Sequence, residues 1–157
     1  YSLGDVIDKI QLTPVAIAEA IHFVKTRFGD NDGRAVEYPL VPTAVFSTPE
    51  LGTVGLSEEH AWQRGHEVHV YSSRFRPMKH TVAGRAGRAF MKIVVDGPSD
   101  KVLGVHVVGP DAAEITQGFA VAMSCGATKS QLDQTIGIHP RAAEELVQMR
   151  EPTRTAR

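Results

Sequence analysis

The sequence predicts an α+β fold in which helices flank an antiparallel sheet. Two observations carry this prediction. The runs AFMKIVVD (89–96) and KVLGVHVVG (101–109) are joined by the short turn GPSD, which is typical of two antiparallel strands in a hairpin. The chain otherwise begins with a helical segment and a linker, and it continues with strands and helices mixed and without internal repeats.

A long helix is predicted near the start of the chain, over residues 14–28. Thr13 can cap this helix, Pro14 suits its first position, and strong helix formers continue up to Gly29. Residues 29–42 are rich in Gly, Asp and Pro, and we expect them to connect two structural units.

Short strands are predicted after this linker, at 43–46, 52–56 and 67–73, in addition to the hairpin. We expect Ser57 to cap a short helix that Gly65 ends. Residues 74–87 contain a Pro and two Gly residues, and we expect a long basic loop there.

Three further helices are predicted in the last third of the chain, at 112–125, 130–134 and 142–150. Asp111 starts the first of these helices and Gly126 ends it. Its apolar residues recur at helical spacing and predict one buried face, made of Ile115, Phe119, Ala122 and Met123.

Composition limits the size, the binding partners and the compartment that we expect for this protein. The 157 residues suffice for one compact domain, and a net charge of -1 gives no general attraction to nucleic acid or to anionic membranes. No apolar stretch approaches the roughly 20 residues of a membrane span. The single cysteine, Cys125, excludes an internal disulfide, which fits a reducing compartment, and we expect a cytoplasmic protein. Because the chain begins at Tyr1 without an initiator Met, we expect a piece of a longer protein.

One possible acid–base pair lies in the last segment. His139 precedes Pro140 and is expected at or just before a helix start, with Glu144 about one and a half turns further on. A carboxylate there can orient the imidazole and favour its charged form, as a general acid near neutral pH requires. On spacing alone, a helix-capping His is the commoner explanation, because His–carboxylate pairs often have no catalytic role.

Two other features could bind ligands. A basic segment could hold an anionic small molecule or a phosphate backbone, although it fits a solvated loop equally well and only one aromatic residue interleaves with it. Its members are Arg74, Arg76, Lys79, His80, Arg85 and Arg88. Asp5 is expected where a strand would end, and Thr13 at a helix start; such positions can bind hydroxyls and electron-rich atoms, but an ordinary turn and cap explain them too. The remaining histidines show no ligand spacing, and we predict no metal site.

Taken together, the segments GDV, LTPVAIAEA, PTAVFSTPELGTVGLSEEHA and the run 102–150 resemble the glutathione reductases, within the FAD-dependent pyridine-nucleotide disulfide oxidoreductases. FRPMKHT and REPTR are similar to the plant and bacterial branch. The resemblance covers nearly the whole chain. It implies that residues 1–40 are the tail of an FAD-binding domain with its linker, and that residues 41–157 are the interface domain of a homodimer.

The resemblance also implies residue roles. Asp5 would hydrogen-bond the ribityl part of FAD, and the backbone at Leu12 and Thr13 would meet the flavin ring. His139 would be the acid–base residue of the glutathione disulfide site, with Glu144 as its partner. It would reach across the dimer into the disulfide site of the other subunit and would also lie near the cofactor. Met78, Lys79 and Glu145 match positions near bound glutathione. NADPH would be the electron donor.

Some features depart from this pattern. The redox cysteine pair, the dinucleotide glycine motifs and the NADPH domain are absent from the chain, and Gln148 stands where glutathione reductases commonly have Thr near the substrate. A dihydrolipoamide dehydrogenase or trypanothione reductase type, or a dimerisation module without a catalytic role, therefore stays open. A nucleic-acid binder is a third class, which the net charge of -1 argues against.

Overall fold

The computed structural model describes residues 1–31 and 33–156, and it divides into two compact units, Tyr1–Val41 and Pro42–Arg157. Each unit is described by itself. Asp32, within the predicted linker, and the last residue, Arg157, lie outside the described residues.

The first unit is built around one long helix. It contains a 3₁₀ turn η1 (Gly4–Ile7), the helix α1 (Thr13–Phe28) and a second 3₁₀ turn η2 (Tyr38–Leu40). The predicted helix and its end at Gly29 are confirmed, but the predicted cap is wrong: the N-cap is Leu12, without a side-chain hydrogen bond, and Thr13 is already helical. Residues 1–3 form no strand before Asp5, which lies inside η1.

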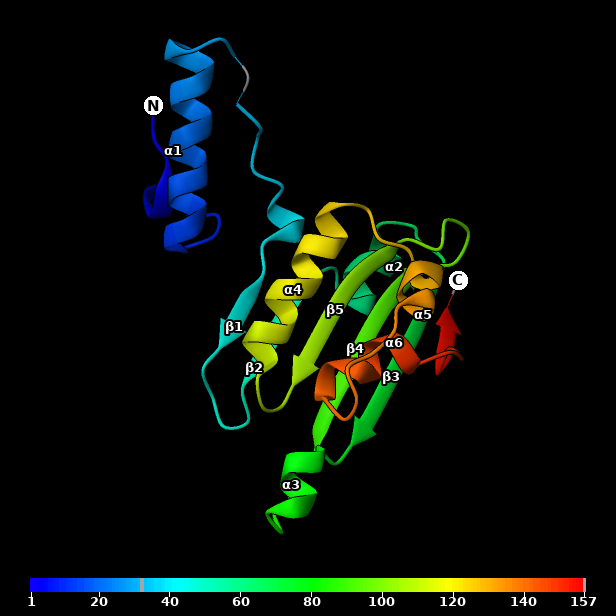
Figure 1. Cartoon of the computed structure of the whole chain (residues 1–157). Helices are drawn as coiled ribbons and strands as arrows, with labels where there is room; N and C mark the ends of the chain where they lie inside the picture. Colours follow the sequence, from blue (N-terminus) through cyan, green and yellow to red (C-terminus); the bar gives the residue numbers. More distant parts are fainter. Residues whose placement is uncertain (32, 157) are drawn as a thin grey trace. The chain divides into compact units, whose positions relative to one another are not determined.

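The second unit contains an antiparallel sheet, and the predicted α+β class is confirmed (Figure 1). In the described residues the strand order is β1-β2-β5-β4-β3-β6, and every neighbouring pair is antiparallel. The strands are β1 (Thr43–Val45), β2 (Leu51–Gly55), β3 (Val68–Phe75), β4 (Ala89–Asp96), β5 (Val102–Val108) and β6 (Arg154–Ala156). The predicted β4–β5 hairpin forms the centre of this sheet.

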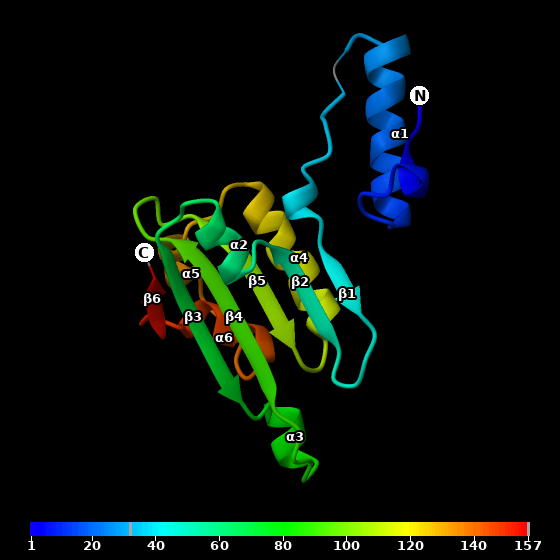
Figure 2. The same ribbon diagram turned by 180° about the vertical axis from the view of Figure 1, so that it is seen from behind.

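Helices cover both faces of the sheet (Figures 1 and 2). On one face lie α4 (Ala112–Ser124), α5 (Lys129–Gln134) and the 3₁₀ turn η3 (Ala142–Glu144), which continues into α6 (Glu145–Gln148). On the other face α2 (Glu58–Gln63) packs through Ala61 onto Val68, Val70 and Val94. Ser57 caps α2, as predicted, by accepting a hydrogen bond from the backbone N–H of His60 at 3.2 Å.

The core follows from strand alternation. Met91, Ile93, Val105 and Val107 are fully buried and point to the same face of β4 and β5, beneath the helices. Leu146 of α6 is also fully buried, so this short helix is anchored in the core.

Three sequence predictions need correction. The expected basic loop is shorter, because β3 runs on through Phe75 and Met78–Val82 form the helix α3. The expected face of α4 is turned: Ala112, Thr116 and Ala120 are buried with Met123, since small side chains allow the helix to lie close on β2 and β5. The expected last helix over 142–150 is only a 3₁₀ turn followed by one α-helical turn, and it ends at Gln148 because Met149 is extended.

None of the helices in the described residues is long and apolar enough to cross a membrane.

Candidate functional site

The predicted His139–Glu144 pair forms in the structure. His139 lies in the loop between α5 and η3, and its Nδ1 is 3.0 Å from Oε2 of Glu144, the last residue of η3. The helical segment begins two residues after Pro140, so His139 is not a helix cap and Pro140 is not the first helical residue. The ring is 79% exposed, whereas the Glu144 side chain is only 15% exposed. A sheltered carboxylate thus holds an imidazole that faces outward.

This geometry fixes which nitrogen is available. An ionised carboxylate only accepts hydrogen bonds, so Nδ1 of His139 must carry the proton that it donates to Glu144. Nε2 is then the nitrogen that can take up or deliver a proton at the exposed side of the ring. Proton transfer to a group approaching Nε2 is the chemistry that the pair supports.

Two residues that the sequence reasoning did not assign hold Glu144 in place. The side-chain amide of Gln148 donates a hydrogen bond to Oε1 of Glu144 at 2.5 Å. The loop passes Glu144 at Gly137, where a Cβ would lie 2.6 Å from Cγ of Glu144. The spacing of four residues in a helix could have indicated the Gln148 contact, but no local pattern could have revealed the Gly137 approach.

The residues expected near glutathione are only partly brought together. Glu145 follows Glu144 and accepts a hydrogen bond from Ser73 of β3 at 2.5 Å. Met78 and Lys79 begin α3, which projects beyond the ends of β3 and β4 (Figure 1). Met78 is half exposed, and Lys79 pairs with Asp111, at the start of α4, at 2.6 Å. Among the described residues, neither Met78 nor Lys79 contacts the His139–Glu144 pair through a hydrogen bond or an ion pair.

The basic segment is folded back on itself. The guanidinium group of Arg76 donates from Nε to the carbonyl oxygen of Arg85 at 2.9 Å, and Nδ1 of His80 lies 2.8 Å from the carbonyl oxygen of Gly87. A groove of about 520 Å³ borders this segment, and Arg85 and Arg88 line it. Arg85 and Arg88 therefore edge this groove from the exposed loop between α3 and β4.

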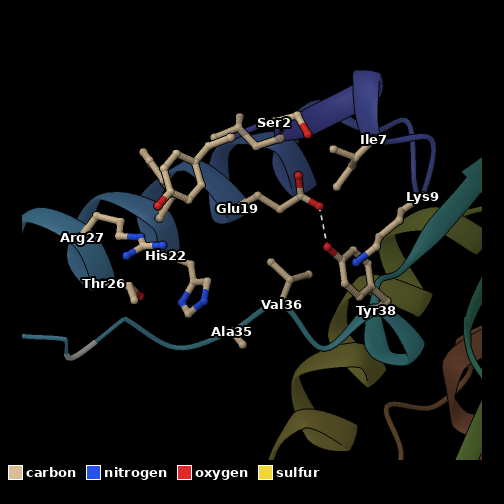
Figure 3. A pocket seen from close by; sticks show the side chains of 13 residues that line it. Ser2, Ile7, Lys9, Glu19, His22, Thr26, Arg27, Ala35, Val36 and Tyr38 are labelled. Carbon is tan, nitrogen blue, oxygen red and sulfur yellow. Dashed lines mark hydrogen bonds between the residues drawn. The ribbon is translucent and has the colours of Figure 1, made fainter.

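Asp5 and Thr13 lie in the first unit, where Glu19 organises the structure. One oxygen of Glu19 accepts a hydrogen bond from the backbone N–H of Gly4 at 2.6 Å, and the other accepts one from the hydroxyl of Tyr38 at 2.6 Å (Figure 3). These bonds, first from Tyr38 and then from Gly4, lower the pKa of Glu19 below its usual range. Glu19 was not predicted, because a single Glu within a helix gives no signal of such a role.

The residues around Asp5 are compatible with part of a flavin site. The carboxylate of Asp5 is exposed on a turn that Glu19 fixes to α1, and Leu12 and Thr13 lie at the start of α1, where backbone N–H groups have no partner within the helix. A carboxylate accepts hydrogen bonds from hydroxyls, whereas the backbone N–H of Leu12 already donates to the carbonyl oxygen of Ile10 at 3.0 Å. The same unit contains a pocket of about 440 Å³, whose lining side chains Figure 3 shows; Asp5, Leu12 and Thr13 are not among them.

The other sequence features stand apart from this site. Cys125 is exposed at the end of α4. His66 precedes β3 and pairs with Asp96 at 2.9 Å. In residues 1–31 and 33–156 there is no cluster of three or more His, Cys, Asp and Glu side chains that could hold a metal ion.

An apolar groove lies close to the acid–base loop. It has a volume of about 370 Å³ and runs between α4, α5, η3 and α6. Ile115, Phe119 and Ala122, the predicted face of α4, line it and are half-buried. Val121, on the same helix, is 59% exposed, whereas Met123 is buried and belongs to the core.

Comparison with known proteins finds one family model. The dimerisation domain of the pyridine nucleotide-disulphide oxidoreductases matches residues 41–150. The chain is similar to a chloroplastic/mitochondrial glutathione reductase of Pisum sativum, with 47% identity over 100% of the chain and 28% of the relative. It is also similar to glutathione reductases of Nostoc sp. (50% identity) and Burkholderia cepacia (49%), in each case over 96% of the chain and 33% of the relative. The chain thus spans about a third of the length of these curated relatives.

Proposed function

Since the chain belongs to the pyridine nucleotide-disulphide oxidoreductases, we propose that it is the carboxy-terminal part of an NADPH-dependent glutathione-disulfide reductase. In this role it supplies the dimer interface and the acid–base pair His139–Glu144. The observation that carries the proposal is the 3.0 Å contact between an exposed imidazole and a sheltered carboxylate. The similarity to glutathione reductases along the whole chain supports the choice of substrate.

The proposed step is protonation of a leaving thiolate. In the complete enzyme, a cysteine thiolate outside this chain attacks one sulfur of glutathione disulfide, forms a mixed disulfide and releases the other glutathione as a thiolate. A free thiol has a pKa near ~8.5, so this thiolate leaves more readily when it is protonated. Nε2 of His139 delivers the proton, and Glu144 stabilises the imidazolium before the transfer.

The cofactors follow from the same proposal. FAD, when bound, supplies the electron transfer from NADPH to the cysteine pair. Residues 1–40 are the tail of the FAD-binding domain and its linker. Asp5 would accept hydrogen bonds from the ribityl hydroxyls, and the backbone at Leu12 and Thr13 and the ring of His139 would lie near the bound cofactor. Most of the FAD site and the whole NADPH site belong to other parts of the enzyme.

Substrate and subunit contacts use residues 41–157, the proposed interface domain. Bound glutathione contacts Met78, Lys79 and Glu145. Lys79 also forms an ion pair with Asp111, so Asp111 and glutathione would both interact with its ammonium group. The basic groove suits a substrate with several carboxylates. The groove along α4 and the exposed Val121 face the second subunit of a homodimer. In this dimer, His139 of one subunit acts in the disulfide site of the other subunit.

Assays of the full-length protein with other substrates distinguish this proposal from three alternatives. A dihydrolipoamide dehydrogenase or a trypanothione reductase type would use other disulfides, and a dimerisation module would have no turnover. The full-length protein should oxidise NADPH with glutathione disulfide faster than with trypanothione disulfide, and it should not reduce NAD⁺ with dihydrolipoamide. Preference for either other substrate, or no turnover with any of them by a flavin-containing protein, would refute the proposal. We also propose a cytoplasmic location and no nucleic-acid partner, which cell fractionation and a binding assay test.

A further inference from the structure

We propose that Gln148 is a positioning residue of the acid–base pair, holding the Glu144 carboxylate so that Oε2 meets His139. The inference rests on the proposed function of this pair. It is based on the two oxygens of the Glu144 carboxylate having different partners. Oε1 accepts a hydrogen bond from the side-chain amide of Gln148 at 2.5 Å, while Oε2 lies 3.0 Å from Nδ1 of His139. Both oxygens are thus engaged by one donor each.

The surroundings leave Glu144 few other orientations. Its side chain is 15% exposed, and the backbone of the loop at Gly137 lies directly against its Cγ. His139 itself is 79% exposed and has no other hydrogen bond in the described residues that could orient it. The direction of the imidazole therefore depends on the carboxylate, and the direction of the carboxylate depends on Gln148.

A purely structural Gln–Glu pair occurs elsewhere in the chain and offers a comparison. On α2 the amide of Gln63 donates to Oε1 of Glu59 at 3.2 Å, with the same spacing of four residues. Glu59 is exposed and has no histidine partner within the part of the chain that the structure describes. Such a pair supports a helix slightly and influences no proton transfer. The pair on α6 differs because its second oxygen holds the proposed proton donor.

The test uses the full-length enzyme with Gln148→Met, which keeps the length of the side chain but removes the donor. Gln63→Met is the matched control, and His139→Gln and Glu144→Gln are the references. We expect Gln148→Met to lower kcat for glutathione disulfide roughly 3- to 10-fold, the size of one lost hydrogen bond. The alkaline limit of the pH–kcat profile should shift to lower pH, because a loose carboxylate stabilises the imidazolium less. Flavin reduction by NADPH should not change.

The outcomes separate this inference from the proposed function. If His139→Gln and Glu144→Gln left disulfide turnover intact, the proposed function would fail. If they lowered turnover while Gln148→Met behaved like Gln63→Met, only the positioning role would be wrong. A rise in KM without any change in kcat or in the pH profile would also overturn it, since this result indicates direct substrate contact by Gln148.

Discussion

Replacing Gly137 by Ala tests how tightly the acid–base pair is built. The added Cβ would lie 2.6 Å from Cγ of Glu144, where ordinary contacts begin at 3.4 Å, so the loop and Glu144 must separate by about 0.8 Å. The Nδ1–Oε2 distance is 3.0 Å, and an N–H···O bond weakens beyond roughly 3.2 Å. A displacement of this size is therefore enough to break the contact between His139 and Glu144.

The expected loss in catalysis is separated from the loss in stability by following the two half-reactions. A misplacement near 1 Å can cost on the order of 100-fold in rate, and we expect disulfide turnover of the full-length Gly137→Ala enzyme to fall roughly 10- to 100-fold. The strain of about 1–3 kcal/mol is offset by at most about 1 kcal/mol from the reduced entropy of the unfolded chain, so the melting temperature should fall by several degrees at most. Stopped-flow absorbance separates flavin reduction, which should be unchanged, from reoxidation by glutathione disulfide. Unchanged reoxidation in a folded Gly137→Ala dimer would refute the reasoning.

Three other predictions concern stability, assembly and cofactor. Burial lowers the pKa of His106 in the folded state. Its contribution to stability is therefore present above the ordinary His pKa of about 6.5 and is lost as the pH falls through the lowered folded value. His106→Gln should flatten this pH dependence of the melting temperature, and an unchanged slope would contradict the prediction. The chain should be a homodimer by light scattering, and Val121→Glu should raise the monomer fraction, whereas a monomeric mass for the unchanged chain at high concentration would speak against the interface. The 157-residue chain alone should not retain FAD, so a yellow purified chain with stoichiometric flavin would show that more of the site lies here than Asp5 and the start of α1.

The fold was largely predictable because its signals are local. The turn GPSD, the alternation in 89–96 and the cap at Ser57 each depend on a few adjacent residues. The errors arose where tertiary packing determines which residues of an element are buried. The buried face of α4 is the one with small residues, because they let the helix approach the sheet closely. The spacing of hydrophobic residues alone does not indicate this.

The candidate site shows the same limit. The pairing of His139 with Glu144 was predicted from spacing and resemblance, although the helix was expected to begin earlier. The supports at Gly137 and Gln148 were missed, since one is an approach between a loop and a helix and the other had been considered only as a departure near the substrate. Glu19 was missed because its partners, Gly4 and Tyr38, are 15 and 19 residues away in the sequence.

The central claim is that His139 delivers the proton to the departing glutathione thiolate. The most direct test compares the two half-reactions of the full-length His139→Gln enzyme, because Gln keeps the size and some hydrogen bonding of the ring but cannot titrate. Reduction of the flavin by NADPH should proceed at nearly the original rate. Turnover of glutathione disulfide should fall by roughly 10²- to 10⁴-fold, as for the loss of a general acid. Disulfide turnover that stays intact in a His139→Gln dimer would contradict the account.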